Sequence, residues 1–172
     1  MVKKTKVLHR PIRESPGKIL VSNHQHAEKI DLRLLKKIGG ELLAKLNIRN
    51  AELEINLVDA REMSVLNWKF LKHEGSTDVI AFDYAESRNR KGISGEIFIS
   101  VDDAIAQAKK FKTSWQSEIT RYLVHGVLHL FGRDDLRPDL RRRMKREENQ
   151  LLRALSRKFS LAQIAGHSKI SS

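Results

Sequence analysis

The sequence predicts a single α+β domain in which a small mixed sheet packs with about five helices, one of them largely buried. Some short segments alternate between apolar and polar residues, which predicts strands, whereas others repeat apolar residues at helical spacing, which predicts helices. The predicted strands and helices alternate along the chain. At 172 residues one domain is the default, and no repeat or low-complexity segment divides the chain. The 40% of hydrophobic residues are enough for a core, which excludes global disorder.

The first half of the chain contains two expected strands and two expected helices. Residues 1–17 are basic, contain two prolines and show no period, which indicates an N-terminal extension. KILVS at 18–22 indicates a short strand, and leucines at helical spacing predict a helix over 31–46 that its first residue, an aspartate, can cap. The alternation at 52–57 is typical of a half-buried strand, and an aspartate can also begin a helix over 59–70.

The second half continues in the same way. TDVIAF at 77–82 and GEIFIS at 95–100 indicate two more strands. Two aspartates can open a helix over 102–111, and a longer, more apolar helix is expected over 113–131. A charged helix follows Pro138, and its apolar stripe consists of Leu140, Met144, Leu151, Leu152 and Leu155.

Positive charge is concentrated in two segments. The chain has 33 Lys and Arg against 21 Asp and Glu, a formal net charge of +12. Residues 1–18 contain six bases and one acid, and residues 133–158 contain ten bases and five acids, whereas the segment between them is nearly neutral. Such patches are typical of proteins that bind a polyanion, first of all nucleic acid or an anionic membrane surface.

Several classes of protein are excluded by composition. The absence of cysteine excludes disulfides, thiolate zinc sites and thiol catalysis, so any metal must be held by histidines and carboxylates. The sequence shows neither an apolar run of about 18 residues nor a short apolar stretch behind a basic start. We therefore expect a soluble, cytoplasmic protein with no membrane partner.

One segment carries residues suited to chemistry. ITRYLVHGVLHLF places apolar residues around most of a helix, which predicts that this helix is buried. His125 and His129 lie four residues apart and therefore share one helix face. Gly132 ends the helix, and a chain that turns back there could bring Asp134 or Asp135 over the histidines. Two His, one carboxylate and an open coordination position suit a catalytic zinc site. Two histidines at this spacing on an apolar helix can instead be core residues that form hydrogen bonds.

This segment resembles the signature of a known family. HGVLHLFGRDD, His125–Asp135, is similar to the pattern His-Gly-x-Leu-His-Leu-x-Gly-x-Asp-His of the YbeY endoribonucleases, the bacterial rRNA maturation factors, and departs from it only at the last position. LN at 66–67, TDVIAF at 77–82 and GEI at 95–97 are similar to further family segments in the same order. Single residues around the signature also agree: Glu118, Met144, Glu147 and Glu148.

The resemblance implies a function. It implies a YbeY-like, metal-dependent hydrolase domain over 18–158, between the extension over 1–17 and a C-terminal tail over 159–172. The expected activity is that of a single-strand-specific endoribonuclease in 16S rRNA 3′-end maturation and ribosome quality control. The expected partners are rRNA and the 30S subunit, with ribosomal or GTPase assembly proteins besides. The expected cofactor is one Zn²⁺, or another divalent metal, held by His125, His129 and Asp135.

Two positions depart from the family. Its third metal ligand is His, where this sequence has Asp135; a carboxylate is also a zinc ligand and favours harder metals. The family has an Arg that faces the phosphate near the metal, and the aligned residue here is Leu71. Lys72 beside it and Arg121, one helical turn before His125, are therefore the candidate catalytic cations, although a lysine lacks the bidentate contact of a guanidinium.

The two departures also support a second hypothesis. In it, the protein is a ribosome-associated RNA-binding assembly factor with little or no nuclease turnover. Composition leaves open a third, a metal-dependent hydrolase with a substrate other than nucleic acid. A peptidase of the HExxH type is disfavoured, because no Glu follows His125 to act as general base.

Overall fold

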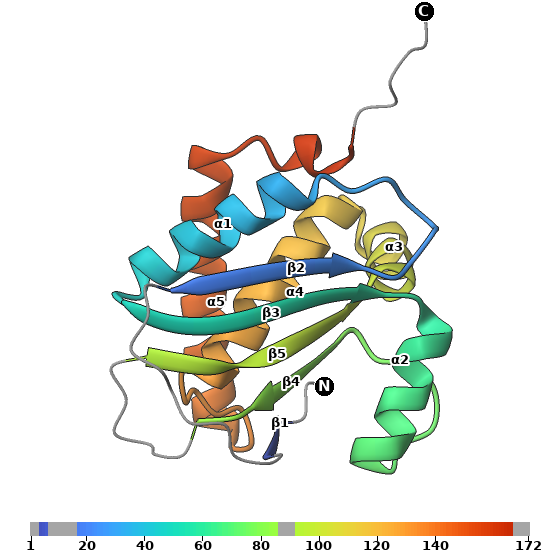
Figure 1. Ribbon diagram of the computed structural model, residues 1–172, viewed down its shortest axis with the longest axis horizontal. Coiled ribbons are helices and arrows are strands. Elements are labelled where there is room, and N and C mark those ends of the chain that lie inside the picture. Colours follow the sequence, from blue (N-terminus) through green and yellow to red (C-terminus); the bar gives the residue numbers. More distant parts are fainter. Residues whose placement is uncertain (1–3, 7–16, 86–91, 167–172) are drawn as a thin grey trace, which may run out of the picture.

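The computed structural model describes residues 4–6, 17–85 and 92–166 (Figure 1). This part of the chain forms a five-stranded mixed sheet and five α-helices, which confirms the predicted α+β domain. The strands are β1 (Lys4–Lys6), β2 (Lys18–Asn23), β3 (Asn50–Val58), β4 (Val79–Asp83) and β5 (Gly92–Ser100). The helices are α1 (Leu32–Lys45), α2 (Ala60–Leu66), α3 (Val101–Phe111), α4 (Trp115–Leu130) and α5 (Pro138–Lys158), with a π-helix η1 (Asn67–Leu71) and a 3₁₀-helix η2 (Leu161–Ile164).

The strand order in the sheet is β1-β4-β5-β3-β2. β4 and β5 pair antiparallel, and the other neighbours pair parallel. In this register Ala81, Ile97, Ile55 and Val21 lie side by side on four successive strands. Because side chains at paired positions point to the same side of a sheet, these residues form one apolar row for helices to cover.

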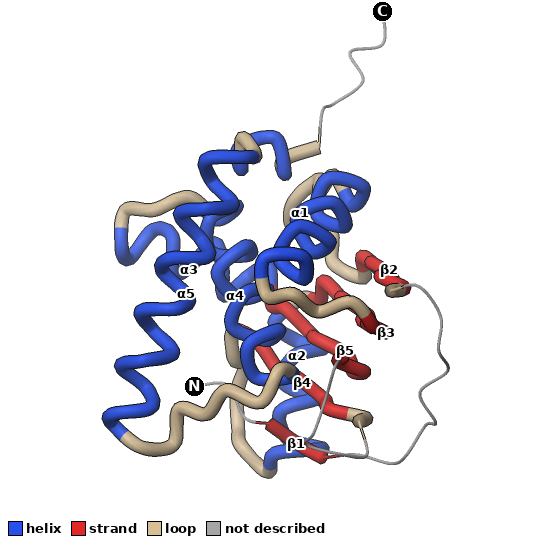
Figure 2. The backbone as a smooth tube through the Cα atoms, turned by 90° about the vertical axis from the view of Figure 1, so that its left-hand side faces the viewer, coloured by secondary structure: helices blue, strands red, loops and turns tan. Residues whose placement is uncertain are grey.

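Helices cover both faces of the sheet, but unequally. α1, α4 and α5 lie on one side (Figure 2), where the main hydrophobic core lies. On β4, Val79 and Ala81 belong to this core, whereas the alternate residues Ile80 and Phe82 pack with Met63 of α2 in a second cluster. α2 and η1 therefore cover the opposite face of the sheet.

Side-chain caps begin four of the helices. Asp31 and Asp59 cap α1 and α2 by accepting backbone N–H bonds, as expected, and Ser114 caps α4. Ser100 caps α3 by accepting from the N–H of Asp103, so that helix begins one residue earlier than expected. None of the helices in the described ranges is both long and apolar enough to cross a membrane.

Residues 159–166, which the sequence assigns to a C-terminal tail over 159–172, pack against the rest of the fold. η2 follows α5 and places Ile164 in the main core, where its side chain is fully buried. The carbonyl of Ile164 accepts a hydrogen bond from the N–H of Asp31, which ties this segment to the start of α1. The folded domain therefore extends beyond residue 158, and residues 167–172 lie outside the described residues.

The expected extension over 1–17 also contributes to the sheet. Lys4–Lys6 form β1, which pairs with β4 at one edge of the sheet. Residues 1–3 and 7–16 lie outside the described residues.

Two glycines set the distance between α4 and β5. A Cβ atom on Gly126 of α4 would lie 2.9 Å from Cδ1 and Cγ2 of Ile97 on β5. A Cβ atom on Gly95 of β5 would lie 2.8 Å from Cδ2 of Leu130 on α4. Glycine is a poor helix former, but Gly126 lies in the middle of α4 because β5 packs where a larger side chain would be.

Substitution of Gly126 tests this close contact. Gly126→Ala is expected to lower the free energy of unfolding by about 1–3 kcal/mol, because overpacking outweighs the better helix propensity of alanine. Urea denaturation followed by circular dichroism measures the change. In an Ile97→Ala background the added methyl group has room, and the same substitution should cost little or nothing; equal losses in both backgrounds would contradict the packing explanation.

Candidate metal centre

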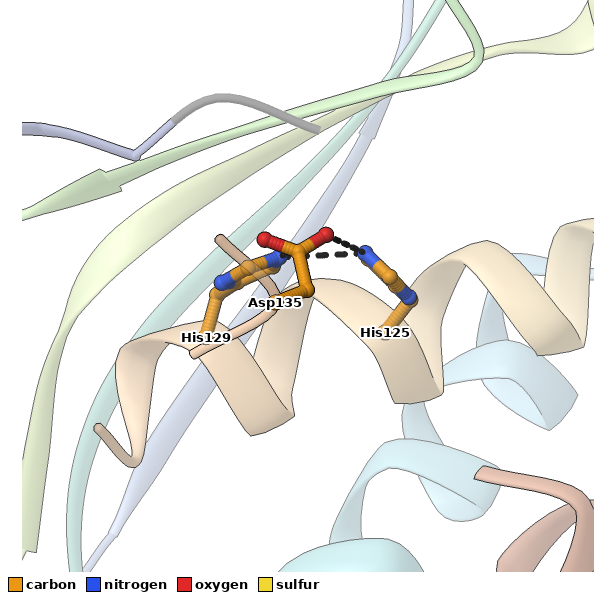
Figure 3. Close-up of side chains that lie close together, drawn as sticks. All are labelled: His125, His129 and Asp135. Carbon is orange, nitrogen blue, oxygen red and sulfur yellow. Dashed lines mark hydrogen bonds and ion pairs between the residues drawn. The ribbon is translucent and has the colours of Figure 1, made fainter. Parts of the chain in front are cut away.

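Two histidines of α4 face away from its most buried side. Leu123, Val124 and Val127 are fully buried in the main core, which fixes how the helix is rotated. His125 and His129 lie on successive turns, and their rings point toward one another (Figure 3). Their Nε2 atoms are 3.0 Å apart, close enough for both to bind one ion.

A glycine turn after α4 returns the chain toward this pair. The N–H of Gly132 donates to the carbonyl of His129 (3.0 Å), and the N–H of Arg133 donates to the carbonyl of Leu128 (2.9 Å). These two bonds form a Schellman motif, which requires a left-handed residue, and Gly132 has a φ of 92°. The turn therefore depends on the glycine that the sequence places there.

Of the two aspartates after the turn, Asp135 lies beside the histidines. Asp134 Oδ1 accepts the N–H of Leu136 (2.9 Å) within the loop. Asp135 Oδ2 lies 3.8 Å from Nε2 of His129 and 4.0 Å from Nε2 of His125. Ligands of a tetrahedral zinc ion lie about 3.4 Å apart, given bonds of about 2.0–2.1 Å. The three donor atoms, all within 4.8 Å of one another, could therefore hold one metal ion after a small movement.

A carboxylate from α5 orients His125. Oε2 of Glu148 lies 2.8 Å from Nδ1 of His125, which leaves Nε2 directed at Asp135. Oε1 of Glu148 accepts from Arg121 (2.7 Å) and from Lys145 (3.0 Å). Burial raises the pKa of Glu148, but the hydrogen bonds with His125, Arg121 and Lys145 outweigh burial and lower it to about 2. A carboxylate that holds the second nitrogen of a histidine commonly supports metal ligation.

Two of the three candidate donors, His125 and Asp135, line a cavity of about 380 Å³. Most of its wall comes from α4 and α5, and its volume is within the range of small-ligand sites. The residues that line it are Asp78, Arg121, Tyr122, His125, Asp135, Arg141, Met144, Lys145 and Glu148.

Only one of the two expected cations lies at this cavity. Arg121 lines it, and its Nη1 donates both to Glu148 (2.7 Å) and to Asn149 (2.9 Å). Lys72 is not among the lining residues; it follows η1 in a left-handed conformation, and its ammonium lies 6.0 Å from the ring centroid of Trp68.

The prediction from sequence gives no role at the site to three residues of α5 that line the cavity, although it names Glu148 as agreeing with the family: Arg141, Lys145 and Glu148. Glu148 lies four residues after Met144 and is 3% exposed, so it shares the apolar stripe of α5. A carboxylate in a buried stripe is a signal that could have identified it. Arg141 and Lys145 carry no such signal, because basic residues occur around most of α5.

Comparison with known proteins identifies the family. The family model described as "Endoribonuclease YbeY" matches residues 20–156. The chain belongs to the YbeY endoribonuclease family. The match includes the candidate donors and Glu148, so the cluster lies within the family domain.

Curated relatives called endoribonuclease YbeY support this assignment. A protein from an Anaeromyxobacter species is 37% identical over 122 residues, 71% of this chain and 64% of the relative. One from Myxococcus xanthus is 36% identical over 148 residues, 81% of this chain but 50% of the relative. The chain thus spans between half and two thirds of these YbeY proteins, whereas it covers 93% of a YbeY relative from Parabacteroides distasonis that is 34% identical.

A solved structure shows the same fold. The solution structure of a Thermotoga maritima protein aligns with a TM-score of 0.63 and 20% identity, over 90% of this chain and 99% of that one. At this identity the likeness concerns the fold alone.

Glu148 is expected to support metal binding through His125. Glu148→Gln should weaken zinc affinity by about 10–100-fold, because a neutral amide oxygen accepts the Nδ1 proton more weakly than a carboxylate does. Competition with a chromogenic chelator measures the affinity. Glu147→Gln is the matched control, since Glu147 pairs with Arg133 on the surface; unchanged zinc affinity in Glu148→Gln would refute the role of Glu148.

Glycine is expected to be required at position 132 only because the backbone there is left-handed, and not because space is short. A Cβ atom there would have no neighbour within 4 Å, so the cost of Gly132→Ala comes from its left-handed φ and should be about 1–2 kcal/mol of unfolding free energy. Gly132→Asn should lose less, because Asn adopts this conformation more readily. Thermal and urea unfolding of the metal-free protein measure both, and an alanine variant as stable as the wild type would disprove the argument.

Proposed function

We propose that the protein is a metal-dependent endoribonuclease that cuts single-stranded rRNA in 16S rRNA 3′-end maturation and ribosome quality control. The observation that carries the proposal is the convergence of three candidate donors, His125, His129 and Asp135, two of which line a cavity beside a basic helix. The YbeY family supports the ribonuclease reaction. The charge of α5 supports RNA as the substrate.

The donor set fits zinc. Two imidazole nitrogens and one carboxylate oxygen are ligands that zinc accepts, and three protein ligands leave a position for water. We infer one Zn²⁺, while the carboxylate also suits a harder divalent metal. Such an ion would lower the pKa of a water molecule toward neutrality and polarise a phosphoryl oxygen.

The residues around the donors hold and orient them. Glu148 keeps the Nε2 of His125 toward the candidate ion, and Arg121 acts through Glu148 as a positioning residue. Lys72 is a candidate contact for RNA outside the cavity, because it does not line it. The protein thereby fixes its donors before substrate arrives, which lowers the reorganisation that the reaction requires.

The exposed side of α5 is suited to the RNA backbone. Its arginines are solvent-exposed, and in the described part of the chain these five have no carboxylate partner: Arg142, Arg143, Arg146, Arg153 and Arg157. Such cations bind phosphates without sequence preference, and the affinity falls steeply with salt. We propose that the partner is rRNA of the cytoplasmic 30S subunit, with ribosomal or GTPase assembly proteins besides.

A second candidate function is RNA binding in subunit assembly with little or no nuclease turnover. Asp135 in place of the family His, and Leu71 in place of the family Arg, favour it. Asp135→His combined with Leu71→Arg separates the two. A large rise in RNA cleavage would support the assembly factor, and little change would support a working nuclease site.

His129 is expected to couple metal content to cleavage. His129→Ala should remove bound metal and abolish cleavage of a single-stranded RNA oligonucleotide together, because a buried donor is lost. Metal analysis of the purified protein and gel electrophoresis of the RNA measure the two effects. His73→Ala, an exposed histidine outside the cavity, should change neither. Cleavage that persists in a metal-free preparation would refute the proposal.

A further inference from the structure

The cavity has three cations on its wall, and two of them are engaged by the same carboxylate. Arg121 donates to Oε1 of Glu148 at 2.7 Å, and Lys145 donates to the same atom at 3.0 Å. Arg121 also lies 3.8 Å from Glu118. Because charges that are already paired attract an anion weakly, neither residue offers its full charge to a substrate.

Arg141 differs from both. It is exposed on the first turns of α5, and its Nε donates to the backbone carbonyl of Asp135 at 3.2 Å. In the described part of the chain it forms no ion pair with a carboxylate. One of its five N–H donors therefore anchors the guanidinium to the loop, while its charge is not neutralised.

This anchor places Arg141 next to the candidate metal. The carbonyl that it binds belongs to Asp135, whose side chain supplies the third donor, and both residues line the cavity. A phosphodiester that reached the three donors would carry its negative charge into this part of the cavity. A guanidinium can bind two phosphate oxygens in parallel, which a lysine cannot do.

The position aligned with the family Arg offers no such group. Leu71 packs at the edge of the second apolar cluster, against the face of the sheet that α2 covers. The site therefore lacks a guanidinium from that loop, and the cavity receives one from α5.

We propose that Arg141 is the catalytic cation of this protein and binds the phosphodiester of the substrate beside the three candidate donors. The inference rests on the proposed function and deepens it, because it assigns the phosphate-binding residue of the same site. It also distinguishes Arg141 from the other exposed arginines of α5, which bind the RNA backbone outside the cavity.

The test compares Arg141→Ala and Arg141→Lys with Arg33→Ala. Arg33 of α1 is the matched control, because it is also an exposed arginine but does not line the cavity. With the zinc-loaded full chain and saturating RNA, Arg141→Ala should lower kcat by about 100-fold or more, and Arg141→Lys should restore only part of it. Arg33→Ala should keep the kcat of the wild type.

A second measurement does not depend on cleavage. Isothermal titration of inorganic phosphate into the zinc-loaded protein should show about tenfold weaker binding in Arg141→Ala and unchanged binding in Arg33→Ala. Equal phosphate binding in wild type and Arg141→Ala, or no phosphate binding by the wild type, would overturn the proposal. If the wild type binds phosphate through Arg141 but cuts no RNA, the nuclease function fails and the phosphate site stands.

The zinc content of the Arg141→Ala protein shows whether Arg141 binds phosphate or instead positions Asp135. Arg141→Ala should retain the zinc of the wild type, since Arg141 touches only a backbone carbonyl of the loop. Loss of zinc in this variant would overturn the proposal, because it would show that Arg141 serves to hold Asp135.

Discussion

The contact between α4 and β5 determines where the candidate metal site lies. Gly126 lets Ile97 approach the helix backbone, and Gly95 does the same for Leu130 from the strand side. A helix held this closely and buried along one side cannot rotate without losing packing on several residues at once. The side of α4 that carries His125 and His129 is therefore fixed relative to the sheet before any ion binds.

α5 completes the site and also closes the core. Met144 and Leu155 bury the helix against the rest of the fold, and Glu148 lies in the same stripe. Its carboxylate is buried and ionised because His125, Arg121 and Lys145 surround it, so removal of any of these partners would leave a buried charge less compensated. One helix thus stabilises the domain and orients a candidate ligand, while Arg141 on its first turns retains a charge for substrate.

Most elements could be predicted from sequence because each is long enough to show its period and several have a side-chain cap. β1 could not be predicted, since three residues show no period and its pairing with β4 is remote in sequence. Ile164 lies in a short segment after the last periodic one, together with Phe159 and Leu161, and the segment is too short to show a period, so its burial could not be expected. The spacing of His125 and His129 identified the helix face, and register with the family signature favoured Asp135 over Asp134. The roles of residues from α5 could not be predicted, because they depend on tertiary packing.

If His125, His129 and Asp135 hold one divalent metal ion, crystals of the zinc-loaded protein will show it directly in diffraction measured on both sides of the zinc absorption edge. We expect one anomalous peak at about 2.0–2.2 Å from Nε2 of both histidines and from a carboxylate oxygen of Asp135. A peak held by other residues, or no peak at this cluster in protein with stoichiometric zinc, would contradict the proposed metal site.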